Sequence, residues 1–471
     1  MKNFVVVLLI ILICLTLVIT SFSETKKVVI YGDAQNLVPV QWLIDEAKEK
    51  GIEIQIAEVP FTSAAEKLKT EFMSQTGAYD LVVMYPSNVG EYADFNYIMP
   101  LDPFLKIADP HLEDVIPAYM GLYCEYTGKI YALPIDGDVL SLYYLKDIFN
   151  NEEEKANFEA EYGYKLTVSE TWDQLADVAK FFTRKKGEKL AGKVLDYDFY
   201  GFGIIGARRW AYAWWSTIFA SYGGNYFDRD MNPQINSEDG VRALEYLKSM
   251  LQYCPPDVLS YGYVELKDAY LLGRLATMIQ WSDIWKKAQD PKMSKIVGNA
   301  GIAVMPGVLK EDGTIYYRAS APCGRVLGIP SNAKHPEEAY WIAYMLSDTL
   351  SGRAIADPDT GLDPYRYSHF NNLSAFKDIA SEDMAKEYLN VVQNNLKQLF
   401  PDLSIPGSAE YLDILDIAVT TALAGDKTPQ KALDDAAKKW DELTDSLDRE
   451  RQKKIYNNML DTWKEYGFWK D

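Results

Sequence analysis

Strand-like and helix-like segments take turns along the early part of the chain, and this order restricts the fold more than any other feature. Residues 27–31 and 52–56 have the pattern of short β-rich strands, and residues 81–84 have the continuous apolar pattern of a buried strand. Residues 42–50 predict an amphipathic helix that ends at Gly51. This alternation predicts an α/β lobe.

Helix starts carry local signals in several places. Ser63-Ala64-Ala65-Glu66 has the pattern of a capping box, and the helix that it opens is expected to end at Gly77. Similar signals predict four later helix starts, at Thr171 with Gln174, at Ser237, and at the prolines Pro336 and Pro429 in the first helical position.

The chain is too long for one compact core. It has 471 residues, of which 48% are hydrophobic and 25% are charged, as in globular proteins. Neither an internal repeat nor a low-complexity linker divides it. We therefore expect two or more lobes that are joined by chain crossings.

The N-terminus has the pattern of a secretory signal. Lys2 precedes an apolar run over residues 4–19, which is shorter than a membrane-spanning helix, and Ser21 and Ser23 are small residues at the positions that a signal peptidase reads. Cleavage is expected after Ser23. Ile13 before Cys14 disfavours a lipid anchor. An uncleaved anchor is the alternative, and either reading places the chain outside the cytoplasm.

Composition excludes several classes of function. The formal net charge of −20 repels nucleic acids and anionic lipid surfaces. Only three histidines are present and none has metal-ligand spacing, so we expect neither a metal nor a cofactor. Beyond the signal, Cys124, Cys254 and Cys323 allow one disulfide at most.

Aromatic residues are abundant, with 11 Trp and 33 Tyr. Most of these rings must pack in the core. The apolar C–H face of a sugar stacks on an indole ring, while its hydroxyl groups bind carboxylates and arginine. The composition is therefore suited to a carbohydrate ligand.

A series of short motifs follows in order along the chain: YDLVV at 79–83, PLD at 100–102, GKIYALP at 128–134, LSLYYLKD at 140–147, TWD at 171–173, YGG at 222–224, FD at 227–228, GRLATM at 273–278 with Trp281, and GDKTPQKAL at 425–433. Each motif is weak singly, but in this order they resemble the extracellular solute-binding proteins of bacterial carbohydrate ABC importers, the group that includes maltose-binding protein.

The resemblance implies the periplasmic-binding-protein-like (type II) α/β fold, with two lobes, a hinge and a ligand cleft between them. It also implies a monomer without catalytic activity that closes on a carbohydrate or polyol and delivers it to a membrane permease. The expected divisions are a signal peptide at 1–23, a first lobe at 24–135 plus about 300–348, a second lobe at about 139–297 plus 352–471, and crossings near 136–138, 298–300 and 349–351.

Acidic and aromatic residues near the expected crossings are the first candidates for ligand binding. Asp136 and Asp138 follow a strand, and a carboxylate there can accept two hydrogen bonds from a diol. The alternative is a solvated Asp-Gly turn. Trp281, at the end of a strand, is at a position where the family stacks an aromatic ring on sugar, and Asp283 lies beside it. Trp285 is expected to be structural.

A second group of candidates combines aromatic and cationic residues. Its members are Arg208, Trp210, Trp214 and Trp215 in one dense cluster, Arg325 and Arg366 near strand ends or polar loops, and Asp33 and Tyr85 after strands of the first lobe. Core packing for the rings and pairing with surplus acids for the arginines are the structural alternatives.

Two motifs are better explained by turns. Gly201-x-Gly203-x-x-Gly206 matches a dinucleotide fingerprint but does not follow a hydrophobic strand, so close backbone packing is the simpler interpretation. Asp228-x-Asp230-x-Asn232 begins like a calcium loop, but Pro233 occupies the position of the required glycine.

Two other functions stay open. One is a binding protein of the same fold for a different solute, such as a polyamine, a phosphodiester or a metal; the surplus of acids would suit a polyamine. A secreted glycoside-processing enzyme would need two carboxyl groups on opposite sides of one bond, and residues two apart in a turn, as Asp136 and Asp138 are, seldom achieve this.

Overall fold

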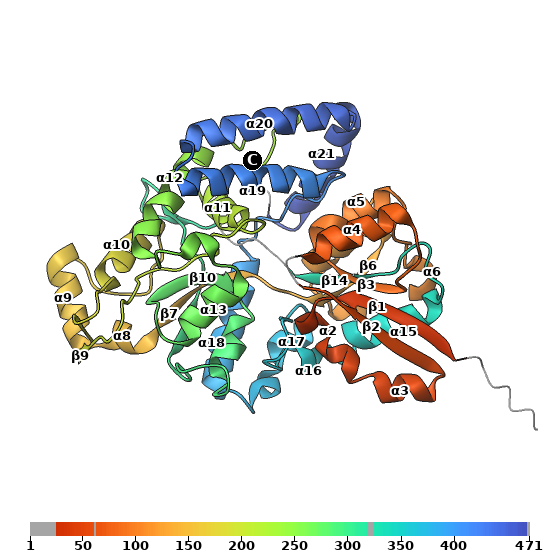
Figure 1. Ribbon diagram of the computed structural model, residues 1–471, viewed down its shortest axis with the longest axis horizontal. Coiled ribbons are helices and arrows are strands. Elements are labelled where there is room, and N and C mark those ends of the chain that lie inside the picture. Colours follow the sequence, from red (N-terminus) through yellow and green to blue (C-terminus); the bar gives the residue numbers. More distant parts are fainter. Residues whose placement is uncertain (1–24, 61–62, 319–323, 469–471) are drawn as a thin grey trace, which may run out of the picture.

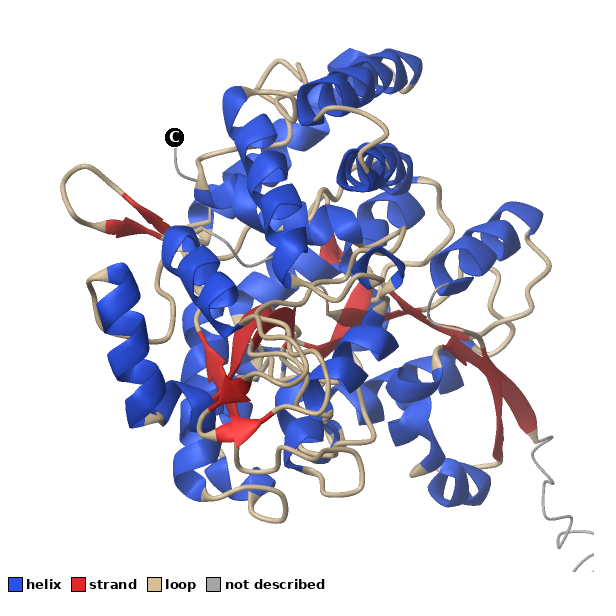
Figure 2. Ribbon diagram, turned by 60° about the vertical axis from the view of Figure 1, so that its left-hand side comes forward, coloured by secondary structure: helices blue, strands red, loops and turns tan. Residues whose placement is uncertain are grey.

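Two separate β-sheets form the centres of two lobes, as the computed structural model shows for residues 25–60, 63–318 and 324–468. In Figure 1 the first lobe lies on the right and the second on the left, with the C-terminal helices above both. Helices surround the strands of both sheets (Figure 2). The predicted signal segment, 1–23, lies outside the described residues.

The first lobe contains a mixed five-stranded sheet with the order β2-β1-β3-β14-β6. Strand β1 is parallel to β2 and β3, whereas β14 is antiparallel to β3 and β6. The strands are β1 (Lys26–Gly32), β2 (Ile52–Glu58), β3 (Leu81–Met84), β6 (Ala132–Asp136) and β14 (Arg325–Gly328), and the helices around them are α2 (Ala34–Gln41), α3 (Ile44–Glu49), α4 (Ala64–Ser74), α5 (Val89–Asp94), α6 (Asp102–Leu105) and α15 (Pro336–Ser347).

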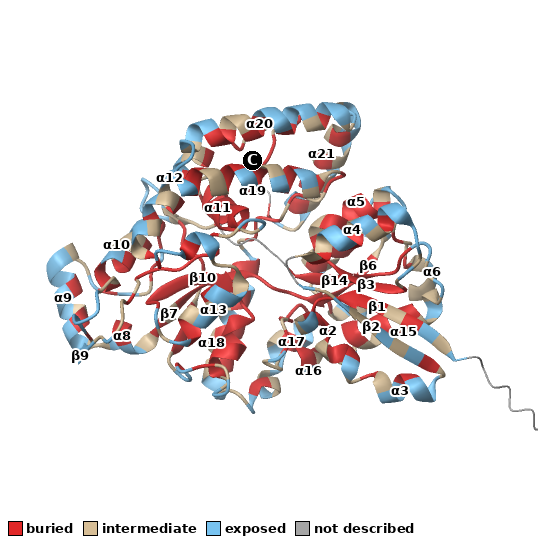
Figure 3. Ribbon diagram, in the orientation of Figure 1, coloured by how far each residue is buried: buried red, intermediate tan, exposed pale blue. Residues whose placement is uncertain are grey.

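The second lobe contains an antiparallel three-stranded sheet with the order β10-β7-β11. Its strands are β7 (Leu140–Leu145), β10 (Thr277–Trp281) and β11 (Ala300–Ala303). The helices of this lobe are α8 (Lys146–Asn150), α9 (Glu152–Tyr162), α10 (Trp172–Phe182), α11 (Ala211–Ser221), α12 (Glu238–Met250), α13 (Tyr263–Leu271), α14 (Ile284–Gln289) and α18 (Glu382–Leu396). Buried residues fill the sheets and the inward helix faces (Figure 3).

Three two-stranded hairpins and several short turns complete the fold. The hairpins pair β4 (Glu125–Tyr126) with β5 (Lys129–Ile130), β8 (Lys189–Leu190) with β9 (Lys193–Val194), and β12 (Val308–Leu309) with β13 (Ile315–Tyr316). The short helices are η2 (Pro86–Asn88), η3 (Leu112–Asp114), α7 (Pro117–Tyr119), the π-helix η4 (Met120–Cys124), η5 (Leu251–Tyr253), η6 (Val258–Ser260), α16 (Ser351–Ala354), α17 (Tyr367–Asn371) and η7 (Leu373–Phe376). Among the described residues, no helix combines the length and the apolar character that crossing a bilayer requires.

The first chain crossing lies between Asp136, where β6 ends, and Leu140, where β7 begins. Gly137 is necessary there, because a Cβ atom would lie 2.1 Å from the carbonyl oxygen of Pro364. The expected crossing near 298–300 is wrong: β11 pairs with β7 in the second sheet, and the chain rejoins the first sheet only at β14.

Three long C-terminal helices reach from the second lobe to the first. They are α19 (Ser408–Ala424), α20 (Pro429–Ser446) and α21 (Arg449–Glu465). The Ser408 hydroxyl donates to the Ser87 carbonyl oxygen at 2.8 Å, and the Arg451 guanidinium lies 2.5 Å from the carboxylate of Asp94. These contacts hold α19 and α21 against the first lobe.

Most of the strands, caps and helix starts that the sequence predicts are present in the structure. The strands at 27–31, 52–56 and 81–84 are confirmed, as are the capping box at Thr171 and the cap at Ser237. Pro336 and Pro429 begin α15 and α20. Added Cβ atoms at Gly201, Gly203 and Gly206 would meet neighbours within 2.7 Å, so these glycines serve close packing.

The helix predicted at 42–50 is present as α3, which begins two residues later, at Ile44, and the separate helix α2 precedes it. The predicted capping box at Ser63 is wrong. Ser63 makes no side-chain cap on α4, and its hydroxyl group donates to the carbonyl oxygen of Pro60 at 3.2 Å instead. Helix α4 ends before Gln75, which adopts the left-handed conformation, and not at Gly77.

Candidate functional site

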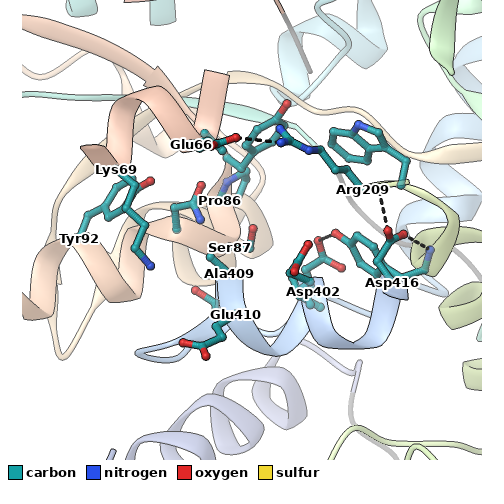
Figure 4. A pocket seen from close by; sticks show the side chains of 18 of the residues that line it. Glu66, Lys69, Pro86, Ser87, Tyr92, Arg209, Asp402, Ala409, Glu410 and Asp416 are labelled. Atoms are coloured by element: carbon teal, nitrogen blue, oxygen red, sulfur yellow. Dashed lines mark hydrogen bonds and ion pairs between the residues drawn. The ribbon is translucent and has the colours of Figure 1, made fainter. Parts of the chain in front are cut away.

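A cavity of about 640 Å³ lies between the two lobes, beside the N-terminal end of α19 (Figure 4). The first lobe contributes residues of α4, η2, α5 and η4, and the second contributes the start of α11, the 401–404 segment and α19. The lining consists of Ala65, Glu66, Lys69, Tyr85, Pro86, Ser87, Asn88, Tyr92, Leu122, Tyr123, Arg208, Arg209, Trp210, Tyr212, Pro401, Asp402, Ser404, Ala409, Glu410, Leu412, Asp413 and Asp416.

Aromatic rings from both lobes meet at the inner end of this cavity. The ring of Tyr85, which follows β3, lies 5.5 Å from the ring of Trp210 at the start of α11. Trp210 in turn contacts Trp281 at the end of β10, edge to face, with 5.1 Å between centroids. The rings connect the two sheets across the cleft, and Tyr85 and Trp210 present apolar surface to the cavity.

Arg325 and Asp33 lie behind Tyr85 in the first lobe. The Arg325 guanidinium stacks over the Tyr85 ring at 4.1 Å. Both residues line a small void of about 10 Å³ that adjoins the large cavity at Tyr85, room for about one water molecule. The Asn36 amide donates to Asp33 Oδ2 at 2.7 Å and orients that carboxylate.

An ion pair crosses the outer part of the cavity. Arg209 Nη2 of the second lobe lies 2.8 Å from Glu66 Oε2 on α4 of the first lobe (Figure 4). The Arg209 backbone, at a φ of +82°, donates its N–H to Asp416 Oδ2 at 2.6 Å. The left-handed conformation of Arg209 is therefore secured by α19.

The remaining arginine of the cavity is also paired. Arg208 lies 2.9 Å from Asp413 and 3.5 Å from Asp416. Burial raises the pKa of Asp416 to about 6, although the backbone N–H groups of Arg209 and Tyr212 and the positive charge of Arg208 oppose this. The arginines of the cavity are therefore paired with acids of its lining, which contains five acidic and three basic side chains.

Asp402 is the acid of the cavity that burial affects most. Its Oδ2 accepts a hydrogen bond from the Tyr212 hydroxyl at 3.1 Å. Its Oδ1 is buried, with no hydrogen-bond partner among the described residues. Burial raises the pKa of Asp402 to about 7, while the hydrogen bond from Tyr212 opposes the shift. This side chain can accept, and when protonated donate, a hydrogen bond to a hydroxyl group.

Four buried carboxylates gather where the chain crosses between the lobes: Asp136, Asp138, Asp283 and Asp363. The Asp363 N–H donates to Asp136 Oδ1 at 2.8 Å, and Ser282 donates both its N–H and its hydroxyl to Asp138 Oδ1 at 3.1 Å. Burial, reinforced by the neighbouring negative charges, raises the pKa of Asp136 and of Asp138 well above the usual range.

Two buried lysines provide positive charge for this cluster. Lys287 lies 2.9 Å from Asp283, and the Lys286 ammonium donates to Thr360 Oγ1 at 2.9 Å. Burial lowers the pKa of Lys286 to about 8. Asp138, Asp283 and Asp363 each offer an oxygen within 4.8 Å of the others, a spacing that a cation could use, but the two lysines already occupy this charge-balancing role.

The family model of the bacterial extracellular solute-binding proteins matches residues 34–349. The chain belongs to this family. The predicted resemblance and the type II periplasmic-binding-protein fold are thereby confirmed.

Known proteins similar to this solute-binding protein include one curated relative and two solved structures. A mannitol-binding protein of Pseudomonas aeruginosa is 24% identical over 296 residues, which are 62% of this chain and 61% of that protein. The solute-binding protein of Agrobacterium radiobacter K84 in complex with ribitol has a TM-score of 0.74 at 24% identity, over 89% of this chain and 99% of that one. The solute-binding protein of Agrobacterium vitis S4 with bound D-mannitol has a TM-score of 0.73 at 20% identity, over 90% and 99%.

The predicted site residues of this solute-binding protein fall into four groups. Tyr85, Trp210 and Arg208 line the cavity, and Asp33 and Arg325 line the adjoining void. Trp281 contacts the cavity-lining Trp210. Asp136, Asp138 and Asp283 belong to the buried cluster at the crossing and line neither space.

Trp214, Trp215 and Arg366 do not line the cavity, contrary to the prediction. Trp214 and Trp215 are fully buried, with their indole N–H groups donating to the carbonyl oxygens of Ile279 and Gly240. The Arg366 guanidinium is 2% exposed and donates to the carbonyl oxygens of Ser347, His111 and Pro110. The three side chains stabilise the lobes.

Several residues of the cavity were not predicted from the sequence. Glu66 was assigned to a capping box, and Asp402, Tyr212 and Asp416 stood in no motif. Arg209 could have been predicted, because it lies in the sequence between the predicted site residues Arg208 and Trp210. Asp402 and Asp416 lie roughly two hundred residues further along the chain, and only the fold brings them here.

Proposed function

We propose that this protein is the secreted substrate-binding component of an ABC importer and that it captures a carbohydrate or polyol between its lobes. The observation that carries the proposal is the cavity itself. It combines aromatic surface from Tyr85 and Trp210 with carboxylates, hydroxyl groups and paired arginines, and both lobes line it. Neutral molecules rich in hydroxyl groups suit such a lining.

The relatives support this ligand class. The curated relative is a mannitol-binding protein, and the two solved structures contain ribitol and D-mannitol. The buried Asp136 and Asp138 lie at the crossing between lobes, where a carboxylate can stabilise the closed arrangement or accept hydrogen bonds from hydroxyl groups.

Capture works through lobe closure. The Glu66–Arg209 ion pair and the Tyr85–Trp210 contact join residues of opposite lobes, so they form only when the lobes are together. A ligand that contacts both sides gains interactions in this state alone and shifts the population toward it. The closed protein then docks, as a monomer, on a membrane permease. It performs no catalysis itself.

A thermal-shift screen of the purified protein tests the proposal. The panel contains ribitol, D-mannitol, D-sorbitol, hexoses, pentoses, their oligosaccharides, uronic acids, putrescine and spermidine. A ligand that binds only the folded state stabilises it by about 2.7 kcal/mol at a hundredfold excess over Kd. A selective shift with a sugar or polyol supports the proposal, and a shift with polyamines alone contradicts it.

A further inference from the structure

Helix α21 is fixed to the second lobe. The hydroxyl group of Tyr456, a buried residue of this helix, donates to the carbonyl oxygen of Phe227 at 3.1 Å and accepts the N–H of the same residue at 3.2 Å. On the same helix, Lys453 Nζ lies 2.5 Å from Asp230 Oδ1. Phe227 and Asp230 belong to the connection between α11 and α12 of the second lobe. These contacts require α21 to move with that lobe.

The same helix also reaches the first lobe, near α5 (Figure 1). Arg451 Nη2 lies 2.5 Å from both carboxylate oxygens of Asp94, the last residue of α5. The side chain of Asp94 is only 11% exposed, and it also accepts a hydrogen bond from the Tyr126 hydroxyl group at 3.0 Å. The first lobe itself therefore holds the carboxylate in place, and Arg451 is the group that crosses between the lobes.

Close packing accompanies this ion pair. The ring of Tyr466, which follows α21, lies so close to Gly121 of η4 that a Cβ atom at this glycine would overlap it. At the start of α19, the Ser408 hydroxyl group donates to the Ser87 carbonyl oxygen at 2.8 Å. Three elements of the first lobe, α5, η4 and η2, thus contact the C-terminal segment that the second lobe carries.

The ion pair and the Tyr466 ring lie outside the ligand cavity. Ser87 and Leu122, from η2 and η4, belong to the lining of the cavity, but Asp94, Arg451 and Tyr466 do not. A solute in the cavity has no need to touch these three side chains. Any effect that they have on binding must therefore act through the arrangement of the lobes.

We propose that Arg451, Asp94 and Tyr466 form a latch that stabilises the closed arrangement of the lobes in the ligand-free protein as well as in the complex. This inference rests on the proposed function and describes how its site is regulated. The protein's own residues supply part of the free energy of closure, so the solute has to supply less.

Separation of the lobes breaks the latch. Arg451 belongs to a helix that the second lobe carries, and Asp94 is held by the first lobe, so their contact exists only in the closed state. An interaction that exists in one of two states shifts the population toward that state. The apparent affinity for a ligand falls with the fraction of molecules in the binding-competent state. A weaker latch therefore weakens solute binding without altering any contact to the solute.

Single-molecule FRET on the ligand-free protein tests the latch directly. Two dyes are attached through azide-bearing residues introduced at positions 49 and 245, which are exposed on α3 of the first lobe and α12 of the second. Arg451→Gln and Asp94→Asn should each lower the ratio of closed to open molecules by about two- to fivefold, as expected for a partly exposed ion pair. The double variant should lower it no further than either single variant.

Arg449→Gln is the matched control. Arg449 lies on the same helix, and its guanidinium forms ion pairs at 2.7 Å with Asp441 and at 2.6 Å with Asp445, both of α20. The substitution should lower the free energy of unfolding but leave the ratio of closed to open molecules unchanged, because these partners belong to the C-terminal helices and not to the first lobe. An effect equal to that of Arg451→Gln would show a general weakening of these helices and would overturn the inference.

Calorimetric titration with the sugar or polyol identified by the thermal-shift screen gives the second readout. Arg451→Gln and Asp94→Asn should each raise Kd by about two- to fivefold, and 1 M salt should remove the difference from wild type. Thermal unfolding of each variant confirms that it folds.

Three results would overturn the inference: a wild-type protein without a closed population in the absence of solute, an unchanged ratio of closed to open molecules in the folded variants, or an unchanged Kd. If no solute of the panel binds while the FRET ratio still falls in the variants, the proposed function fails and the latch stands. The two failures are therefore distinguishable.

Discussion

Substitution of Asp402 by asparagine should remove the loss of folding stability that this carboxyl group causes as the pH rises. Burial raises the pKa of this carboxyl group from the ordinary 3.8 to about 7. The folded state therefore keeps a proton that the unfolded chain releases between about pH 4 and pH 7. The native state binds more protons in that window, so the contribution of Asp402 to stability falls as the pH rises and its loss is complete above about pH 7.

The size of the effect follows from the shift. A displacement of about three pKa units corresponds to about 4 kcal/mol over the whole window. Integration between pH 5 and pH 8 alone gives about 2.5 kcal/mol. Asparagine has the same shape and still accepts the hydrogen bond that Tyr212 donates at 3.1 Å, but it has no charge to bury.

Urea unfolding of the ligand-free protein, followed by tryptophan fluorescence at several pH values, measures this. From pH 5 to pH 8 the free energy of unfolding of Asp402→Asn should rise relative to wild type by about 2–3 kcal/mol. Asp413→Asn is the control, because Asp413 lines the same cavity with a side chain that is 53% exposed. Parallel pH profiles for wild type and Asp402→Asn would refute the reasoning.

Three further predictions concern the cleft and the crossing. Trp210→Ala should weaken ligand binding about two- to tenfold in calorimetry, because the ring joins Tyr85 to Trp281 across the lobes; unchanged affinity would exclude it from the site. Glu66→Gln and Arg209→Gln should each weaken ligand binding slightly, because a partly exposed ion pair contributes about 0.2–1 kcal/mol. This loss of affinity should disappear in 1 M salt, and the double variant should bind no more weakly than either single variant. Gly137→Ala should destabilise the protein by about 2 kcal/mol or more in urea unfolding, because the added Cβ atom would lie 2.1 Å from a backbone oxygen. Gly352→Ala is the control and should be neutral or stabilising, because the space around Gly352 is open. Equal effects of the two substitutions would contradict the close approach at Gly137.

Local signals in the sequence determined the secondary structure where short-range physics decides it. The alternating isoleucines at 52–56 form β2, and Thr171 with Gln174 forms a reciprocal cap, because both patterns depend only on neighbours in the chain. The ordered motifs likewise identified the family and its fold. Where a local signal failed, as at Ser63, the hydroxyl group donates to the carbonyl oxygen of Pro60 and caps no N–H group of α4.

Strand pairing and side-chain burial needed the tertiary structure. The sequence at 300–303 is compatible with either sheet, and its pairing with β7 decides the lobe to which it belongs. Trp210 and Trp214 lie one helical turn apart, but Trp214 is buried against β10 whereas Trp210 reaches the cavity. Periodicity places residues on a helix face, and only packing decides which face meets solvent.

The sequence by itself therefore determined the α/β class, the family, and five of the residues that line the cavity and its adjoining void: Asp33, Tyr85, Arg208, Trp210 and Arg325. Only the tertiary structure added Asp402 and Asp416 to that site and placed Arg366 among backbone carbonyl groups away from it. The physical reason is distance along the chain: these environments form from segments far apart in sequence, and no local propensity encodes which of them will meet.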